Sequence, residues 1–193
     1  MLTLTKARAK ITDMRIITGI ARGRRLKTPG SLDTRPTAES VKEAVFSALQ
    51  FDIEGRTALD LFAGSGQLGL ETLSRGARKA VFVDKSPAAA EVVRENLETC
   101  GFLAKAEIHS TDYALYLKKC TSRFDLAFLD PPYSLGVIPA VLPLLEPLMN
   151  ENGTVICETG AAATLPAQVG ALRLSKERKY GKTKIWYYRK EDA

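Results

Sequence analysis

A glycine-rich turn between an apolar strand pattern and a helix pattern constrains the fold of this 193-residue chain more than any other feature. An apolar run at 57–62 leads into Gly64-Ser-Gly66-Gln-Leu-Gly69, and a helical pattern follows. Glycines at this spacing allow a tight turn and let a ligand approach the backbone closely. A second apolar run ends in Asp84, which stands 18 residues beyond Gly66, where a ribose-binding acid belongs. The pattern predicts a strand–helix–strand unit that binds a nucleotide-like cofactor.

The alternation of strand and helix patterns continues along the chain. We expect helices at 37–50, 66–75, 112–119 and from Ser86 to Gly101, and a proline-broken helical stretch at 135–149. We expect strands at 57–62, 80–84, 105–109, 124–129 and 153–158, and a closing hairpin at 172–180 and 183–189. Such alternation predicts an α/β fold with a mostly parallel, seven-stranded sheet, helices on both faces and an antiparallel C-terminal edge strand.

A carboxylate, two prolines and an aromatic ring follow the apolar run 124–129 in the order Asp130, Pro131, Pro132, Tyr133. Open α/β sheets bind ligands at the carboxyl ends of their strands, which is where this group should lie. Proline fixes its own φ and donates no backbone hydrogen bond, so the carbonyls here should be stiff acceptors. A carboxylate and a fixed carbonyl suit a nucleobase amino group, and the ring offers a stacking face worth ~1–3 kcal/mol. The alternative is a strand that ends in a Pro-Pro turn with a capping aspartate.

The acid at the end of the first strand indicates which cofactor the turn binds. A nicotinamide dinucleotide places its pyrophosphate at the helix N-terminus, where the carboxylate of Asp60 would repel it. Asp60 suits a cationic ligand instead, such as the amino group and sulfonium of S-adenosylmethionine. Asp84 could alternatively cap the following helix, but Ser86 is better placed for that role, so we favour a ligand role for Asp84.

Charge is distributed unevenly along the chain. Residues 1–30 carry eight Lys/Arg against one acid, residues 171–193 carry eight against three, and residues 31–170 carry 12 against 18, which together give the net charge of +6. Two basic flanks around an acidic middle favour a polyanionic partner such as nucleic acid over an evenly charged surface. We expect an extension without strong pattern at 1–13, a basic β-hairpin at 14–34 and a catalytic domain at 35–193.

Several classes of protein are disfavoured by composition. No apolar run approaches the ~20 residues of a membrane span, and the basic N-terminus lacks the apolar stretch of a secretory signal, so we expect no membrane association. The three cysteines are widely spaced, which favours free thiols in a reducing compartment and no metal site.

The motifs Asp60-x-Phe-x-Gly64-x-Gly66, Asp84 and Asp130-Pro-Pro-Tyr133 occur in the order seen in adenosylmethionine-dependent methyltransferases that act on nucleobase amino groups, and the chain resembles that group. The resemblance implies that Asp60 and the glycine turn hold the methionine end and that Asp84 binds the ribose. It also implies that Asp112 lies near the adenine, although a helix N-cap explains Asp112 equally well. The implied cofactor residues are Asp60, Phe62, Ala63, Gly64, Ser65, Gly66, Asp84, Lys85, Asp112 and Tyr113.

A narrower resemblance covers the chain from about residue 15 to the C-terminus. The stretches Arg15-Ile-Ile-Thr-Gly-x-x-Arg-Gly-Arg-Arg-Leu26, Arg35-Pro-Thr37 and Phe62-Ala-Gly-Ser-Gly66-x-Leu-Gly-Leu-Glu71 make it similar to the bacterial RsmD family. Those class I enzymes methylate guanine N2 in small-subunit ribosomal RNA. The resemblance implies a Rossmann-like fold, a cytoplasmic location and ribosomal RNA in a partly assembled subunit as partner; we expect a monomer. The expected RNA-binding residues are Arg22, Arg24, Arg25, Lys27, Arg35, Lys182 and Lys184.

Other functions stay open at this stage. The nearest alternative is an amino-directed methyltransferase acting on adenine N6 of nucleic acid or on a protein glutamine. The basic flanks disfavour the glutamine. An RNA-binding assembly factor with a degenerate cofactor fold is a third possibility, which the intact motif Asp130–Tyr133 disfavours.

Overall fold

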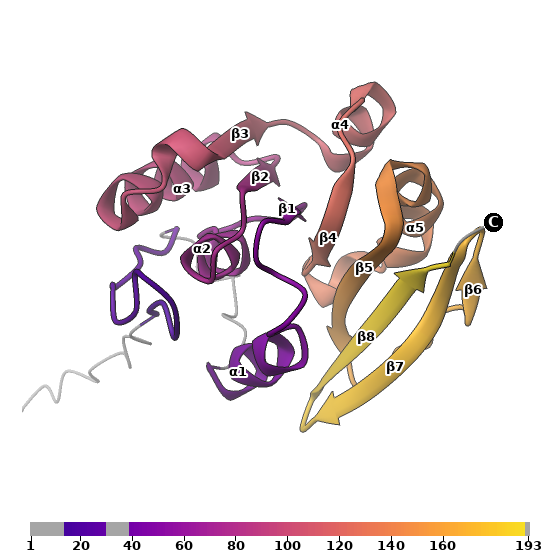
Figure 1. The fold of residues 1–193 in the computed structure, drawn as a ribbon. Coiled ribbons are helices and arrows are strands. Elements are labelled where there is room, and N and C mark those ends of the chain that lie inside the picture. The colour runs from indigo at the N-terminus through magenta and orange to yellow at the C-terminus, as the bar shows by residue number, and fades with distance from the viewer. Residues whose placement is uncertain (1–13, 30–38, 192–193) are drawn as a thin grey trace, which may run out of the picture.

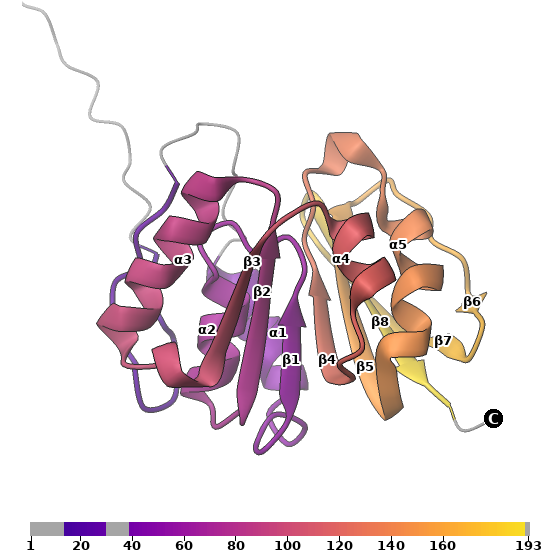
Figure 2. The ribbon, with the colours of Figure 1, turned by 90° about the horizontal axis from the view of Figure 1, so that it is seen from above.

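A computed structural model describes residues 14–29 and 39–191 of the chain. The expected extension at 1–13, Arg35 and the beginning of the first expected helix lie outside the described residues. One mixed sheet runs through the middle of the described part, and helices cover both of its faces (Figures 1 and 2). The predicted α/β class is therefore confirmed.

Five neighbouring strands of the sheet are parallel. They are β1 (Thr57–Asp60), β2 (Lys79–Asp84), β3 (Ala106–Ser110), β4 (Phe124–Leu129) and β5 (Met149–Gly160). Three antiparallel strands complete the sheet, namely β6 (Gln168–Val169), β7 (Leu172–Tyr180) and β8 (Thr183–Lys190). The order across the sheet is β3-β2-β1-β4-β5-β8-β7-β6.

Two details of the predicted sheet are wrong. The sheet of the described residues has eight strands and not seven, because the two-residue β6 is too short to show as a sequence pattern. The last strand, β8, is not at the edge. The closing hairpin pairs with β5 through its second strand, so β8 lies between β5 and β7.

The helices divide between the two faces, and each group encloses its own part of the core. Helices α1 (Glu39–Ala48), α2 (Gln67–Ser74) and α3 (Pro87–Cys100) cover one face, where Phe46, Leu70 and Val93 are buried. Helices α4 (Tyr113–Lys119) and α5 (Ile138–Leu145) cover the other. The expected helix break is present, because Pro143 lies inside α5 and a 3-10 turn follows at Glu146–Leu148.

The predicted ends of α3 are confirmed in atomic detail. The Ser86 hydroxyl accepts a hydrogen bond from the Ala89 amide, Pro87 is the first helical residue, and Gly101 ends the helix at φ 75°. Glycine adopts this left-handed conformation without the steric cost of a side chain. The local sequence is sufficient to place this helix.

The basic N-terminal part folds back on itself as expected of a hairpin, but without two regular strands. Residues 14–27, here called the anchored segment, have a single antiparallel bridge between Arg15 and Arg25 in place of two strands. Backbone hydrogen bonds join its two arms, from the Ile16 amide to the Arg24 carbonyl at 2.9 Å and from the Leu26 amide to the Met14 carbonyl at 2.8 Å. Helix α2 holds the loop between the arms, where the amide of Ile20 donates to the Ser74 carbonyl at 2.9 Å. Gly19 has φ 89°, and a Cβ on it would lie 1.9 Å from that carbonyl oxygen. The anchored segment thus lies against α2 as a closely packed loop.

Candidate active site at the carboxyl ends of the parallel strands

Acidic side chains follow the parallel strands at one edge of the sheet. Asp60 and Asp84 are the last residues of β1 and β2, Asp112 lies two residues beyond β3, and Asp130 follows β4 directly. Because neighbouring parallel strands end at the same edge, the sequence-predicted acids are brought to one side of the molecule.

Asp60 is buried under the glycine turn. Its carboxylate accepts a hydrogen bond of 3.0 Å from the Gly69 amide in the first turn of α2. Burial raises the pKa of Asp60 to about 7, the nearby Asp84 adds to the rise, and the hydrogen bond from Gly69 opposes it. A buried carboxyl group that titrates near neutral pH will be more fully ionised beside a cationic ligand.

Asp84 holds the glycine turn from the other side. One carboxylate oxygen accepts from the Gly64 amide at 2.9 Å, and the other accepts from the Ser86 amide at 2.8 Å. Gly64 and Gly66 have φ values of 54° and 76°, so both need the conformational freedom of glycine. Ser86 is the cap of α3, as expected, and Asp84 orients the turn.

The third glycine of the motif has a packing role. A Cβ on Gly69 would lie 2.3 Å from Cε1 of Phe82 in β2, closer than any tolerated carbon contact. The absence of a Cβ on Gly69 lets α2 pack directly on β2 beneath the turn. This is the role of the third glycine in the dinucleotide fingerprint.

The other expected cofactor residues lie around the turn in different environments. Phe62 is half-buried, and its ring centroid is 5.4 Å from that of Tyr113. The structure therefore brings the loops after β1 and β3 together. Ala63 and Ser65 are buried, whereas Lys85 is exposed. Asp112 caps α4 by accepting from the Ala114 amide at 2.8 Å, so the helix-cap alternative describes its contacts.

The motif Asp130–Tyr133 leads from the end of β4 to the surface. Asp130 is half-buried, Pro131 is buried and Pro132 is exposed, and 41% of Tyr133 is exposed. The Tyr133 hydroxyl donates to Oε1 of Glu158 at 2.7 Å and lies 3.0 Å from Oγ1 of Thr183. Burial raises the pKa of Tyr133, so the hydroxyl keeps its proton and can donate. The ring is thus oriented by β5 and β8 as well as presented to solvent.

Glu158 is a residue that the sequence reasoning missed. The pairing between β4 and β5 ends at Leu129 and Cys157. Asp130 and Glu158 are the next residues, so they lie side by side. Both line a small pocket beneath α1, together with Lys42, Val45, Leu68, Phe128, Leu129, Ile156 and Ile185. An available signal was that β5 ends near an acid, as β1 and β2 do.

Most of the expected RNA-binding residues are exposed. Arg22, Arg24, Arg25 and Lys27 lie on the surface of the anchored segment, although Lys27 also pairs with Glu95 at 2.7 Å. Lys182 is exposed in the β7–β8 turn, beside the carboxyl end of β5, because Thr183 pairs with Gly160. Arg35 lies outside the described residues.

Lys184 has a different environment from the other basic residues. Only 17% of its side chain is exposed, and its ammonium lies 2.9 Å from Glu177 and 3.7 Å from the Trp186 ring centroid. These contacts hold Lys184 against the sheet.

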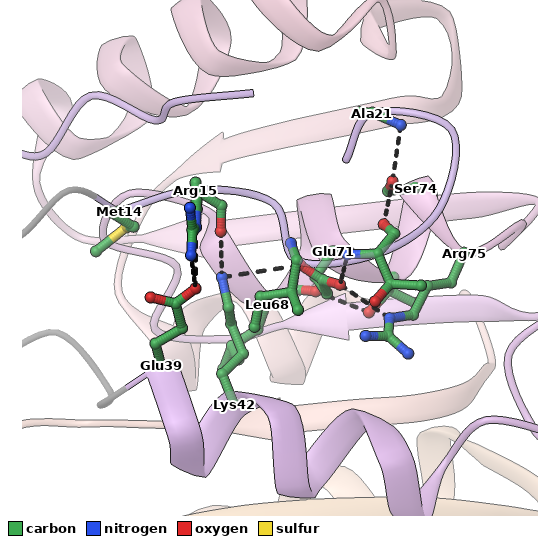
Figure 3. A network of polar contacts seen from close by, with 12 residues as sticks. Met14, Arg15, Ala21, Glu39, Lys42, Leu68, Glu71, Ser74 and Arg75 are labelled. Carbon is green, nitrogen blue, oxygen red and sulfur yellow. Dashed lines mark hydrogen bonds and ion pairs between the residues drawn. The ribbon is translucent and has the colours of Figure 1, made fainter. Parts of the chain in front are cut away.

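The anchored segment is held beside the glycine turn by buried polar contacts (Figure 3). The carboxylate of Glu71 in α2 accepts from the amides of Ile17 and Thr18 at 2.8 and 2.9 Å. The ammonium of Lys42 donates to the Arg15 carbonyl at 2.7 Å.

A second attachment joins the segment to the turn itself. The Asn96 side chain accepts from the Lys27 amide at 2.8 Å, and donates to the Lys27 carbonyl at 3.0 Å and to the Ser65 carbonyl at 2.9 Å. The basic residues of the anchored segment and the glycine turn are therefore parts of one packed unit.

Residues 14–29 and 39–191 contain no group of three or more His, Cys, Asp or Glu side chains placed to hold a metal ion. None of the helices in these ranges combines the length and the apolar character needed to span a bilayer.

Known proteins resemble this chain over nearly its whole length. A family model described as "Conserved hypothetical protein 95" matches residues 14–189. "Putative rRNA methyltransferase YlbH" of Bacillus subtilis is 37% identical over 92% of this chain and 99% of its own length. "Ribosomal RNA small subunit methyltransferase D" of Haemophilus influenzae is 38% identical over 76% of this chain and 79% of its own.

A solved structure agrees with the fold. The structure titled "Putative methyltransferase yhhF from Escherichia coli" superimposes with a TM-score of 0.83 at 29% identity. The match covers 92% of this chain and 98% of that one. The fold is thus shared, over nearly its whole length, with a protein described as a putative methyltransferase.

Proposed function

This chain belongs to the "Conserved hypothetical protein 95" family, the RsmD-type adenosylmethionine-dependent methyltransferases, and from that membership we propose its reaction. It transfers a methyl group from S-adenosylmethionine to the exocyclic N2 amine of a guanine in small-subunit ribosomal RNA. The observation that carries the proposal is the placement of Asp130-Pro131-Pro132-Tyr133 at the same sheet edge as the glycine turn. The name of the Haemophilus influenzae relative supports the substrate.

The reaction is an in-line displacement. The lone pair of the guanine N2 amine is delocalised into the ring, so the amine is a poor nucleophile. The Asp130 carboxylate and the Pro131 carbonyl accept its hydrogens and turn the lone pair toward the methyl carbon. A nitrogen–carbon bond forms as the sulfur–carbon bond breaks, leaving S-adenosylhomocysteine. Asp130 or water takes the released proton. Orientation and electrostatics provide most of the acceleration.

The cofactor lies along the edge formed by β1, β2 and β3. Asp60 and the turn Gly64–Gly66 hold the methionine end, and Asp84 binds the ribose hydroxyls. The buried Asp60 supports this assignment because a cationic amino group would stabilise its ionised form. Phe62 and Tyr113 border the adenine end, with Asp112 fixing the start of α4.

The RNA contacts the basic residues on either side of this edge. Arg22, Arg24, Arg25 and Lys27 provide phosphate contacts from the anchored segment, and Lys182 provides one from the β7–β8 turn. Lys184 supports the sheet and is a weaker candidate for phosphate contact. Ribosomal RNA in a partly assembled subunit is the proposed partner, for a monomeric enzyme in the cytoplasm.

Methyl transfer to small subunits from cells that lack this protein tests the proposal. Incubation with labelled S-adenosylmethionine should yield N2-methylguanosine on nucleoside analysis. Asp130→Ala should abolish transfer while leaving the affinity for S-adenosylhomocysteine nearly unchanged, since Asp130 is assigned to the substrate amine. The matched control is Glu151→Ala, which removes an exposed acid at the amino end of β5. Label in N6-methyladenosine, or only in protein, would favour the alternative substrates instead.

A further inference from the structure

One face of β7 carries two cations and an aromatic ring in a row. Lys176, Arg178 and Tyr180 alternate along the strand after its bulge, so their side chains project from the same face at intervals of about 6.7 Å. The ammonium of Lys176 lies 5.4 Å from the centroid of the Tyr187 ring, which is packed in the core on the side of α1–α3. The row, here called the β7 strip, therefore faces the side of the sheet on which α1 lies.

The β7 strip is open to solvent. Residues 175–179 are all exposed, and Tyr180 is half-buried. Strand β7 lies outside β8 (Figure 1), and β6 pairs with β7 only at Leu172 and Arg173, which precede the strip. The structure therefore leaves this length of β7 accessible to a partner.

The two faces of β7 differ in charge. Neither Lys176 nor Arg178 forms an ion pair with any residue in the described part of the chain. On the opposite face the carboxylate of Glu177 lies 2.9 Å from the ammonium of Lys184. The positive charge of the β7 strip is thus available to an anionic partner, whereas part of the charge on the other face is neutralised.

The β7 strip begins beside the proposed active site. Tyr180 pairs with Thr183 across the hairpin turn, and Thr183 pairs with Gly160 at the carboxyl end of β5. The hydroxyl of Tyr133 lies 3.0 Å from Oγ1 of Thr183. The strip therefore starts next to the ring that is proposed to stack on the target base, and it leads away from that ring along β7.

A nucleic acid strand that delivers a base to this site must be locally single-stranded. Enzymes that act on a base within a structured nucleic acid take the base out of its stack, so the neighbouring nucleotides are drawn out as well. Proteins hold such extended strands with a row of cations that follows the phosphates, together with aromatic side chains. Cations at regular intervals on one face of β7 match that requirement.

We propose that the single-stranded RNA next to the target guanine runs along the β7 strip, with Arg178 and Lys176 contacting its phosphates. This inference rests on the proposed function, because it concerns the path of the same substrate away from the same site. The two cations add phosphate contacts to those proposed for the anchored segment and Lys182.

Protection of the sheet edge is the alternative explanation for these charges. Charged side chains on an exposed strand discourage it from pairing with the strands of other molecules. That role does not depend on the face, and Lys179 on the opposite face is also exposed and would serve it equally. Arg178 and Lys179 are therefore a matched pair, since they are adjacent, carry one charge each and project from opposite faces.

The salt dependence of binding to small-subunit particles compares the two faces. Arg178→Ala should flatten the slope of log affinity against log salt by roughly 0.7–0.9, and the double variant with Lys176→Ala by roughly 1.4–1.8. Lys179→Ala should keep the wild-type slope. All three side chains are exposed, so these variants should fold normally. Equal slopes for Arg178→Ala and Lys179→Ala would overturn the proposal.

Cross-linking identifies the molecule that lies on the strip. A photoreactive benzoylphenylalanine in place of Arg178 should cross-link to RNA within a few nucleotides of the methylated guanine, which primer extension can map. The same group in place of Lys179 should give little of this product. Cross-links from position 178 that reach mainly a ribosomal protein, or RNA remote from the methylated guanine, would contradict the proposed path.

Methylation of the same particles separates this inference from the proposed function. Arg178→Ala should raise KM for the particles and leave kcat nearly unchanged, because the lost contact contributes equally to binding the substrate and the transition state. A wild-type protein that forms no N2-methylguanosine would refute the proposed function itself. Normal methylation by the wild type, with Arg178→Ala and Lys179→Ala alike in KM, would refute only the path along β7.

Discussion

Lys42 and Glu71 meet inside the protein with their charged atoms 3.8 Å apart and side chains that are 2% and 0% exposed. One comes from α1 and the other from α2, and together they bind the backbone of the anchored segment. Arg75 supplies a second cation to Glu71 at 2.9 Å. Burying such a network costs free energy. Its contribution is to fix one arrangement of α1, α2 and the anchored segment, in which every charged group has a partner.

Removing Lys42 should therefore destabilise the fold. Lys42→Met leaves the buried carboxylate of Glu71 with one cation fewer and the Arg15 carbonyl without its donor. We expect the free energy of unfolding to fall by about 3 kcal/mol. Urea unfolding followed by Trp186 fluorescence measures it. Lys79→Met, which breaks the exposed pair with Glu107, should cost less than about 1 kcal/mol. Equal losses in the two variants would contradict the buried network.

The affinity for the cofactor should depend on pH through Asp60. Because its pKa is raised to about 7, Asp60 is ionised above that pH and neutral below it. The ionised form attracts the amino group of the ligand, so affinity for S-adenosylhomocysteine should fall as pH decreases. The loss from pH 8 to pH 6 should approach tenfold, and calorimetry at several pH values measures it.

Two variants identify the titrating group. Asp60→Asn should bind weakly and show little dependence on pH in this range. His109→Gln, which removes the chain's one histidine, should retain the dependence, because Asp60 is unchanged in this variant. Affinity that is constant from pH 6 to pH 8 in the wild-type protein would be inconsistent with the role assigned to Asp60.

Asp84 should contribute to cofactor binding both directly and through the turn. Asp84→Ala removes the proposed ribose acceptor and the acceptor of the Gly64 amide. We expect a loss on the order of 1.5–3 kcal/mol, or roughly 10- to 150-fold in Kd. Calorimetry with S-adenosylhomocysteine tests this. Unchanged affinity in both Asp84→Ala and Asp60→Ala would show that the cofactor does not bind at this edge.

Gly69 should tolerate no side chain while Phe82 stays in place. Gly69→Ala puts a methyl group 2.3 Å from the Phe82 ring, so we expect a destabilisation of about 1–3 kcal/mol. The double variant Gly69→Ala, Phe82→Leu should recover part of that loss by making room. Thermal unfolding of the wild type, the two single variants and the double variant checks it, and additive losses would show that the two residues are not in conflict.

RNA binding should weaken with salt in proportion to the number of phosphate contacts. We assume one phosphate contact for each of five exposed residues, which are Arg22, Arg24, Arg25, Lys27 and Lys182. Log affinity should then fall with log salt at a slope of roughly −3.5 to −4.5 from these five contacts alone. Replacing Arg22, Arg24 and Arg25 by Ala should flatten the slope by about two to three units. Titration against substrate particles at several salt concentrations measures both slopes.

The control removes the same charge at the other end of the strands. Lys105, Lys118 and Lys119 are exposed and precede β3 and β4, away from the proposed active site. Their triple Ala variant should keep the wild-type slope. Equal slopes for all three proteins would place the RNA contacts elsewhere on the surface.

Elements whose signals are local can be predicted from the sequence. Strand β4 was placed to the residue, and Ser86, Pro87 and Gly101 placed α3, because a cap and a left-handed glycine act within one turn of helix. The alternation of patterns predicted which acids would end the parallel strands, and therefore that they would meet at one edge.

Tertiary structure decided every feature that depends on partners far apart in the chain. Glu71 finds its backbone donors 53 and 54 residues earlier, and Tyr133 finds Glu158 25 residues later. Whether a carboxylate caps a helix, as Asp112 does, or lines a pocket, as Glu158 does, depends on which strands become neighbours. The position of β8 between β5 and β7 also depends on tertiary structure, because strands can pair by hydrogen bonds whatever their order along the chain.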